Sequence, residues 1–162
     1  MIEPTALQSI AGQWRHGRGE KMLDVLNPAS EKTVARFQAA SAQDIDEALA
    51  ATQAGFDHWR GLTALERCNM LRCAAGLLRE LMAEIAPLLT EEQGKTRIEA
   101  EREIEQAAQM IEWNAEEGRR AVGQTIPSRY PGVRFQTLKL PVGPVAALTP
   151  WKRSVCRKSS SP

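Results

Sequence analysis

The sequence has few residues of the kinds that build metal and redox sites. Its three cysteines, Cys68, Cys73 and Cys156, show neither metal-ligand nor redox spacing, and its two histidines, His16 and His58, are isolated. We therefore predict no metal site. An odd cysteine count without a secretory leader predicts free thiols in a reducing compartment. We interpret Cys68 and Cys73 as ordinary helix positions, because no neighbouring histidine could activate a thiolate.

Long apolar runs are also missing. No stretch approaches the ~20 apolar residues that a membrane-spanning helix needs. The first four residues contain an early acid instead of the basic and then apolar pattern of a targeting peptide. These features predict a cytoplasmic protein that does not associate with a membrane.

The chain has no large excess of charge of one sign. Its formal net charge is +1, and residues 152–162 carry four basic residues and no acidic one, so the rest is mildly acidic. Nucleic-acid-binding domains concentrate basic residues on one face, and this chain does not. We therefore expect no nucleic-acid partner. A hydrophobic fraction of 43% over 162 residues is typical of one globular domain.

Strand and turn signals fill the first forty residues. Residues 10–14 and 22–26 each predict a short strand, with a polar, glycine-containing loop between them. Asn27-Pro28 predicts a turn, and residues 33–37 predict a third short strand.

Three helical segments follow, and each opens with a capping signal, in which a Ser or Thr precedes an acid by three residues. The signals are Ser41 with Asp44, Thr63 with Glu66, and Thr96 with Glu99. The first helix should end near Gly61 and carry an apolar face of Ile45, Leu49, Thr52, Phe56 and Trp59.

The second helical segment has an apolar stripe from Leu71 to Leu88 that Pro87 interrupts, so we predict a break between Leu81 and Pro87. The break gives three or four helices in all. Gly94 is a natural C-terminal cap. The third segment should end between Gly118 and Gly123 and point inward Ala100, Ile104, Ala107, Ile111 and Ala115.

The last part of the chain predicts strands. Residues 133–140 are rich in strand formers, but Val133 and Phe135 share one face while Leu138 and Leu140 share the other, which implies a bulge or a strand used by two partners. Residues 145–149 lack polar alternation, which is typical of a strand covered on both faces in a parallel sheet. The fold class is therefore α/β, although the chain does not supply the neighbouring parallel strands.

Several short motifs follow one another along the chain. In order they are Asn27-Pro28-Ala29, Phe56-Asp57-His58-Trp59, Leu89 to Lys95, Glu99-Ala100, Ala115-Glu116-Glu117 to Ile126-Pro127, and Pro141 to Trp151. With these motifs, the order of elements from about Ile10 to Trp151 resembles the N-terminal third of the NAD(P)-dependent aldehyde dehydrogenase superfamily. The residues at 116–120 and 141–151 are most similar to the succinate-semialdehyde or glycolaldehyde dehydrogenase branch.

The resemblance implies a fold and a division of the chain. Residues 1–151 correspond to an incomplete N-terminal part, with the start of the cofactor-binding domain, a strand pair of the oligomerisation type within residues 125–140, and the first strand of a truncated Rossmann-like sheet. Residues 152–162 lose both the amphipathic pattern and the family likeness, so we expect a disordered tail that is read out of frame. A genuine alternative terminus on a non-catalytic protein is the other explanation.

The resemblance also implies the site residues. Leu148, Thr149, Pro150 and Trp151 correspond to residues in the wall of the cofactor cleft, where the family binds NAD or NADP. The family has an Asn after this Pro-Trp pair that stabilises an oxyanion, and Lys152 occupies its position here. A lysine supplies a flexible point charge in place of a fixed amide donor, so we predict no working oxyanion hole.

The resemblance implies an enzyme family that oxidises an aldehyde, perhaps a semialdehyde, to the carboxylic acid with NAD(P)+. The catalytic cysteine, the general base and the pyrophosphate site have no counterpart in this chain. We therefore expect a truncated dehydrogenase, inactive as written, that does not bind the cofactor. The alternative is a non-catalytic fragment that forms a homo-oligomer or associates with a full-length paralogue through its oligomerisation strands.

Overall fold

The computed structural model describes residues 7–148, which form four helices and six short strands. The first two strands, β1 (Gln8–Ile10) and β2 (Gln13–Arg15), form an antiparallel hairpin. The prediction of one strand over residues 10–14 is therefore wrong. Ala11 and Gly12 both have positive φ angles, 54° and 77°, and two consecutive residues of this kind make a tight turn that reverses the chain.

The next two strands agree with the sequence. β3 (Met22–Leu26) pairs antiparallel with β4 (Thr33–Gln38), which is one residue longer than expected. The turn at Asn27-Pro28 is confirmed, because the Asn27 side chain accepts hydrogen bonds from the amides of Ala29 and Ser30 at 2.9 and 3.2 Å.

The three predicted helix starts are confirmed. Helices α1 (Ala42–Gly61), α2 (Ala64–Glu80) and α4 (Arg97–Arg119) each begin with a complete capping box, in which the cap hydroxyl accepts the third amide and the acid accepts the cap amide. Such boxes satisfy amides that a helix leaves unpaired at its start. The ends of α1 at Gly61 and of α4 at Arg119 also agree with the sequence.

The break in the second helical segment falls at Leu81, six residues before the proline. Helix α3 (Met82–Gln93) contains Pro87, whose missing amide leaves the carbonyl of Ala83 without its helical partner. Arg97 donates a hydrogen bond to that carbonyl from Nη2 at 3.3 Å, so the proline is accommodated inside the helix. Gly94 ends α3 as predicted, at a φ of 73°.

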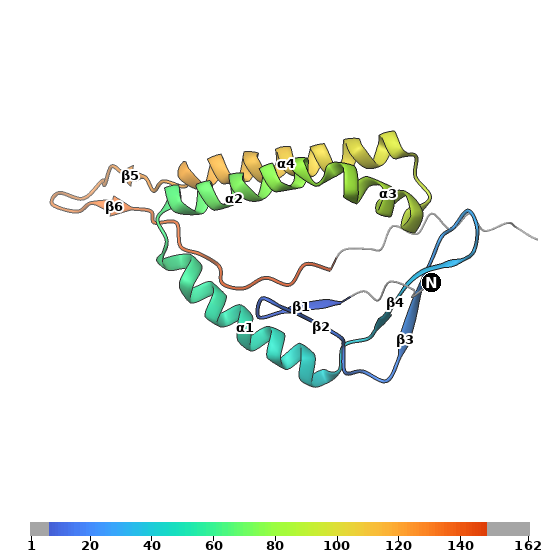
Figure 1. Ribbon diagram of the computed structural model, residues 1–162. Helices are drawn as coiled ribbons and strands as arrows, with labels where there is room; N and C mark the ends of the chain where they lie inside the picture. The colour runs from blue at the N-terminus through green and yellow to red at the C-terminus, as the bar shows by residue number, and fades with distance from the viewer. Residues whose placement is uncertain (1–6, 149–162) are drawn as a thin grey trace, which may run out of the picture.

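Helices α2, α3 and α4 form what we call the helix layer, in which α2 and α4 lie side by side (Figure 1). Its interior consists mainly of small side chains that let the helix backbones approach closely, together with Ile104. The expectation that Ala107 points inward is wrong, because Ala107 is exposed and Ala108 is fully buried. The other buried side chains are Cys68, Ala75, Ala86, Ala100 and Ala115.

Residues 7–61 form what we call the N-terminal unit, in which α1 packs mainly against β1 (Figure 1). Most of the predicted apolar face of α1 remains accessible, since Ile45 and Leu49 are 53% and 63% exposed. The residue that α1 buries completely is Asp44.

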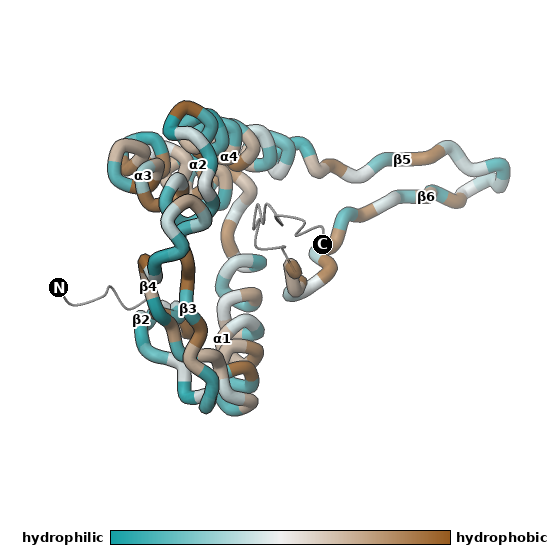
Figure 2. The backbone as a smooth tube through the Cα atoms, turned by 90° about the vertical axis from the view of Figure 1, so that its right-hand side faces the viewer, coloured by the Kyte–Doolittle hydropathy of each residue, from teal (hydrophilic) through white to brown (hydrophobic). Residues whose placement is uncertain are grey.

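Residues 121–148, the C-terminal arm, begin with a hairpin of β5 (Thr125–Ile126) and β6 (Phe135–Gln136). The hairpin projects away from the rest of the molecule in both views (Figures 1 and 2). Of the predicted strand over residues 133–140, Phe135 and Gln136 form β6, and the Thr137 amide adds one hydrogen bond to the Gln124 carbonyl at 2.9 Å. The expectation of a strand over residues 145–149 is wrong for residues 145–148, because they are irregular and no neighbouring strand pairs with them.

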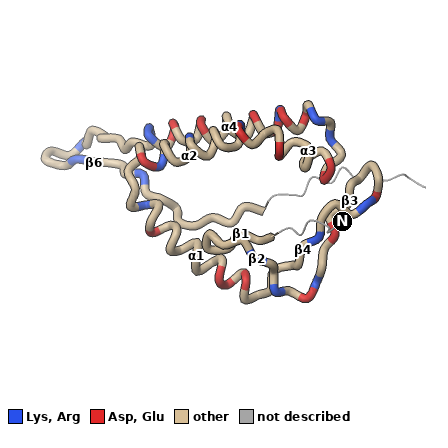
Figure 3. The backbone as a smooth tube through the Cα atoms, in the orientation of Figure 1, with Lys and Arg blue, Asp and Glu red and all other residues tan. Residues whose placement is uncertain are grey.

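Helices of the described chain carry charges of both signs, with acidic and basic residues interspersed along α2 and α4 (Figure 3). None of the helices within residues 7–148 has a stretch that is both long and apolar enough to span a bilayer.

Candidate functional site

The predicted cofactor-wall residues do not form a cleft in the part of the chain that the structure describes. Leu148 is the last described residue, and its side chain is 98% exposed on irregular backbone. Thr149, Pro150 and Trp151, and Lys152 at the oxyanion position, lie outside the described residues. The role of these residues at a cofactor cleft stays a prediction.

Cys68 and Cys73 are free and lie on α2, as predicted. The buried Cys68 thiol donates to Oε1 of Glu116 on α4 at 3.6 Å, and Arg72 Nη1 lies 3.8 Å from the same oxygen. This hydrogen bond links α2 to α4 and is a structural contact. Cys73 is exposed.

Over residues 7–148, no group of three or more His, Cys, Asp or Glu side chains could hold a metal ion. His16 and His58 are both exposed, on different parts of the N-terminal unit. The structure does not bring them together with other ligands.

A hollow of about 430 Å³ lies along α4. Its lining residues follow one helical stripe, and Met110 and Trp113 are 62% and 65% exposed. The lining has no titratable group and so no acid, base or nucleophile. It consists of Gln106, Gln109, Met110 and Trp113.

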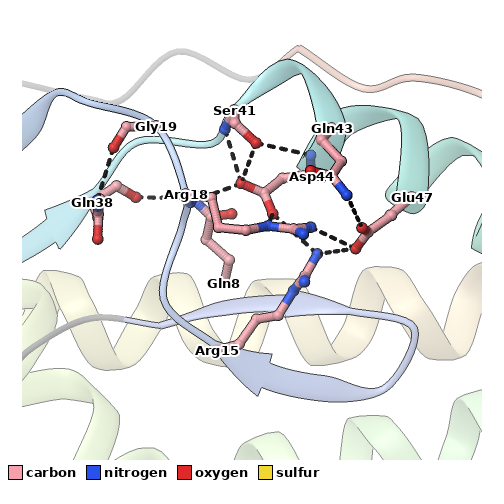
Figure 4. A network of polar contacts seen from close by, with 9 residues as sticks. All are labelled: Gln8, Arg15, Arg18, Gly19, Gln38, Ser41, Gln43, Asp44 and Glu47. Carbon is pink, nitrogen blue, oxygen red and sulfur yellow. Dashed lines mark hydrogen bonds and ion pairs between the residues drawn. The ribbon is translucent and has the colours of Figure 1, made fainter.

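The most completely built polar site in the described chain surrounds the buried carboxylate of Asp44 (Figure 4). Oδ2 of Asp44 accepts the Ser41 amide and hydroxyl, both at 2.9 Å, and the Arg18 amide at 2.8 Å. Oδ1 accepts Nε of Arg18 at 2.7 Å and lies 3.1 Å from Nη2 of Arg15. We call this group, with Glu47, the Asp44 node.

Glu47 completes the node one turn further along α1. Its Oε2 lies 2.6 Å from Nη2 of both Arg15 and Arg18. Each arginine therefore contacts two carboxylates, and the node joins the loop after β2 to the first two turns of α1 (Figure 4).

The charges of the node are strongly coupled to its hydrogen bonds. The Ser41 amide and then the Arg18 amide and side chain hold the pKa of Asp44 well below its usual range, against the opposing effect of burial. Arg18 and then Arg15 lower the pKa of Glu47, and Glu47 and then Asp44 raise the pKa of Arg18. A carboxylate that accepts this many donors is a poor general base, so the node is a structural element.

Two glycines bring the loop close enough for these contacts. A Cβ atom on Gly17 would lie 2.3 Å from the carbonyl oxygen of Ala39, and one on Gly19 would lie 2.7 Å from it. The Gly19 amide donates to the same oxygen at 2.8 Å. The sequence showed Ser41 and Asp44 only as a capping box, and the one further signal was the Gly17-Arg18-Gly19 run.

A second charged cluster joins α2 to α4. Arg79 donates to Glu112 at 2.7 and 2.8 Å and from Nε to Glu105 at 3.0 Å. Glu112 and then Glu105 raise the pKa of Arg79, and Arg79 in turn lowers the pKa of both acids. This cluster fixes how the two helices are aligned.

The sequence model of the aldehyde dehydrogenase family matches residues 14–157. Among curated proteins, 4-(hydroxymethyl)benzenesulfonate dehydrogenase TsaD1 of Comamonas testosteroni is 49% identical over 142 residues, which are 88% of this chain and 30% of that protein. Succinate-semialdehyde dehydrogenase [NADP(+)] GabD of Escherichia coli is 39% identical with the same coverage.

Solved structures agree with the sequence comparisons. An NAD-dependent benzaldehyde dehydrogenase from Corynebacterium glutamicum matches with a TM-score of 0.74 and 32% identity, over 78% of this chain and 28% of that one. The chain thus spans about 30% of the length of the curated relatives named above. Its fold matches the N-terminal part of the fold of the solved dehydrogenase. The chain belongs to the aldehyde dehydrogenase family.

Proposed function

We propose that this chain is the N-terminal scaffold of an NAD(P)-dependent aldehyde dehydrogenase, and that the 162-residue chain alone is catalytically inactive. The family reaction would convert an aldehyde, in our proposal a semialdehyde, to its carboxylic acid. The identity of 39% to a succinate-semialdehyde dehydrogenase supports this substrate class. Free thiols at Cys68 and Cys73 fit a protein of the reducing cytoplasm.

One observation carries the proposal of inactivity. Leu148, where the resemblance locates the beginning of the cofactor-cleft wall, is 98% exposed, and no strand within residues 7–148 pairs with it. Nucleotide cofactors bind at the carboxyl ends of parallel strands, where several strand ends and loops converge. The strands of the described chain pair in three separate antiparallel hairpins, so no such convergence supports a nucleotide.

The experiment is a turnover assay. The purified 162-residue chain is mixed with succinate semialdehyde and NAD+ or NADP+, and the absorbance of the reduced nicotinamide is followed. E. coli GabD serves as the positive control, and a heat-denatured sample gives the background. We expect the chain to remain at the background rate. Turnover above it with either cofactor would overturn the proposal of inactivity.

A second candidate function is association with an intact dehydrogenase. The hairpin of β5 and β6 supports it, because it projects from the molecule with unpaired edges and exposed apolar side chains, including Phe135 at 46% exposure. Such an edge is suited to pairing with a strand of another chain.

Co-expression tests the association. A tagged copy of this chain is co-expressed with an untagged full-length dehydrogenase from the same genome and then captured. Phe135→Asp should abolish co-purification, whereas Gln136→Glu, which adds a charge on the adjacent hairpin position, should preserve it. Equal capture with both variants would show that the hairpin is not the contact.

A further inference from the structure

The described chain divides into two parts that pack mainly within themselves. In the N-terminal unit, β1 pairs with β2, β3 pairs with β4, and α1 packs against β1. In the helix layer, α4 packs against both α2 and α3. In the ribbon, the backbones of the two parts come close at the top of α1 and beside α3 (Figure 1).

Small junctions connect the described residues of the two parts. At one, Leu62 and Thr63 are extended between α1 and α2, and Arg67 Nη1 donates to the carbonyls of Leu62 and Trp59. At the other, Gly94 lies against Pro28, so that a Cβ atom on Gly94 would be 2.6 Å from Cγ of that proline. Neither junction buries a large apolar side chain.

The helix layer and the N-terminal unit are each stabilised internally by different kinds of interaction. The helix layer has seven buried hydrophobic residues, whereas within residues 7–61 Val25 is the one hydrophobic residue that is buried. The completely buried side chain of the N-terminal unit is Asp44, whose node connects the loop at Arg18, the start of α1 and, through Arg15, the end of β2. The unit therefore lacks an apolar core of its own.

We propose that the N-terminal unit unfolds and refolds as one piece while the helix layer stays folded, and that the Asp44 node is what holds this unit closed. Removing one partner from a buried, charged hydrogen-bond network leaves the others desolvated and unpaired. Proteins open locally in contiguous cooperative units, and the β3–β4 hairpin lies in the chain between Arg18 and Ser41, which the node joins. The chain thus carries a detachable N-terminal unit on a two-residue link.

Hydrogen exchange measured by mass spectrometry on the full chain tests this. Asp44→Asn should raise exchange roughly tenfold or more across residues 8–61 and leave residues 64–119 unchanged within about twofold. Asp46→Asn is the matched control, since Asp46 is exposed in the same helical turn, and it should change neither part. A uniform rise over both parts, or no rise, would contradict the proposal.

Variants outside Asp44 keep the test decisive if Asp44→Asn alters the chain too severely. Ser41→Ala removes the hydroxyl that donates to the Asp44 carboxylate and accepts the Asp44 amide, but leaves both arginines in place, so it should give a smaller rise in the same residues. Arg79→Met acts in the opposite part and should raise exchange in α2 and α4 alone. If Arg79→Met also releases residues 8–61, the two parts unfold together and the proposal fails.

Discussion

The helix layer buries apolar side chains within the chain itself, whereas the C-terminal arm buries none. Ala75, Ala86 and Ala108 are fully buried between helices, but Leu140 and Val142 in the arm are 79% and 91% exposed. This difference in burial follows from how helices and strands satisfy their backbone hydrogen bonds. A helix satisfies its backbone groups within one segment, while a strand requires a neighbour. The arm therefore has strand-forming residues without the partners that would complete a sheet.

A charge introduced into each of the two regions should give the largest difference in the free energy of unfolding. Leu78 on α2 packs against the cluster of Ala86, Ala100 and Ile104, so Leu78→Glu should lower the free energy of unfolding by about 3 kcal/mol or more. Leu138→Glu in the exposed arm should change it by less than about 0.5 kcal/mol. Urea unfolding followed by helical circular dichroism measures both. Equal destabilisation would mean that the arm is packed in solution.

A larger side chain at the helix interface should also reduce stability. Ala108→Leu should destabilise the helix layer by about 1–3 kcal/mol, because the close helix packing leaves no room for the added atoms. Ala107→Leu is the matched control at the next, exposed position and should have little effect. Urea midpoints compare the two variants. A lower midpoint for Ala107→Leu than for Ala108→Leu would mean that Ala107 is the inward residue, as the sequence predicted.

Acid should weaken the helix layer. Thr63 lowers the pKa of Glu66, Thr96 lowers that of Glu99, and Arg79 lowers those of Glu105 and Glu112. A carboxyl whose pKa is lower in the folded state stabilises the fold at pH values above its unfolded-state pKa, which is 4.5 for Glu. This stabilisation is lost as the pH falls through the folded-state pKa.

Burial raises the pKa of Glu92, which acts in the opposite direction but stands alone against these four. The urea midpoint should therefore be constant near neutral pH and fall as the pH drops below about 4.5. Glu66→Gln combined with Glu99→Gln should flatten this fall. A midpoint that rises in acid would contradict the assignment of these hydrogen bonds.

The smallest effect concerns a single helix cap. Thr63→Ala removes the hydroxyl that accepts the Glu66 amide at 3.2 Å and should cost about 1 kcal/mol. Thr52→Ala is the control, because the Thr52 hydroxyl only donates to the carbonyl of Ala48 within α1. Thermal melts should give a lower midpoint for Thr63→Ala than for Thr52→Ala.

The sequence predicted features that depend on nearby residues and missed those that depend on distant ones. Capping boxes at Ser41, Thr63 and Thr96 are local, and all three helix starts are where the sequence indicated. The tight turn at Ala11 was missed because alanine rarely adopts a positive φ. Ala108 was missed because alanine gives little hydrophobic contrast with its neighbour Ala107.

Two features depend on partners that the sequence pattern does not reveal. Arg18 is 26 residues from Asp44, so the node emerges only when the loop folds onto α1. The strand expected over residues 145–149 has the residue types of a buried parallel strand, but residue type does not provide a neighbouring strand. The cofactor-wall role of residues 148–151 therefore stays a prediction from the family likeness, and the Asp44 node could not be predicted from the sequence.

We propose that this chain folds the scaffold of an aldehyde dehydrogenase without forming its cofactor site. Isothermal titration of the purified chain with NAD+ and with NADP+ would detect such a site, with E. coli GabD as the positive control for NADP+. We predict no saturable heat of binding for the chain with either nucleotide. Saturable one-to-one binding of either nucleotide would contradict the claim.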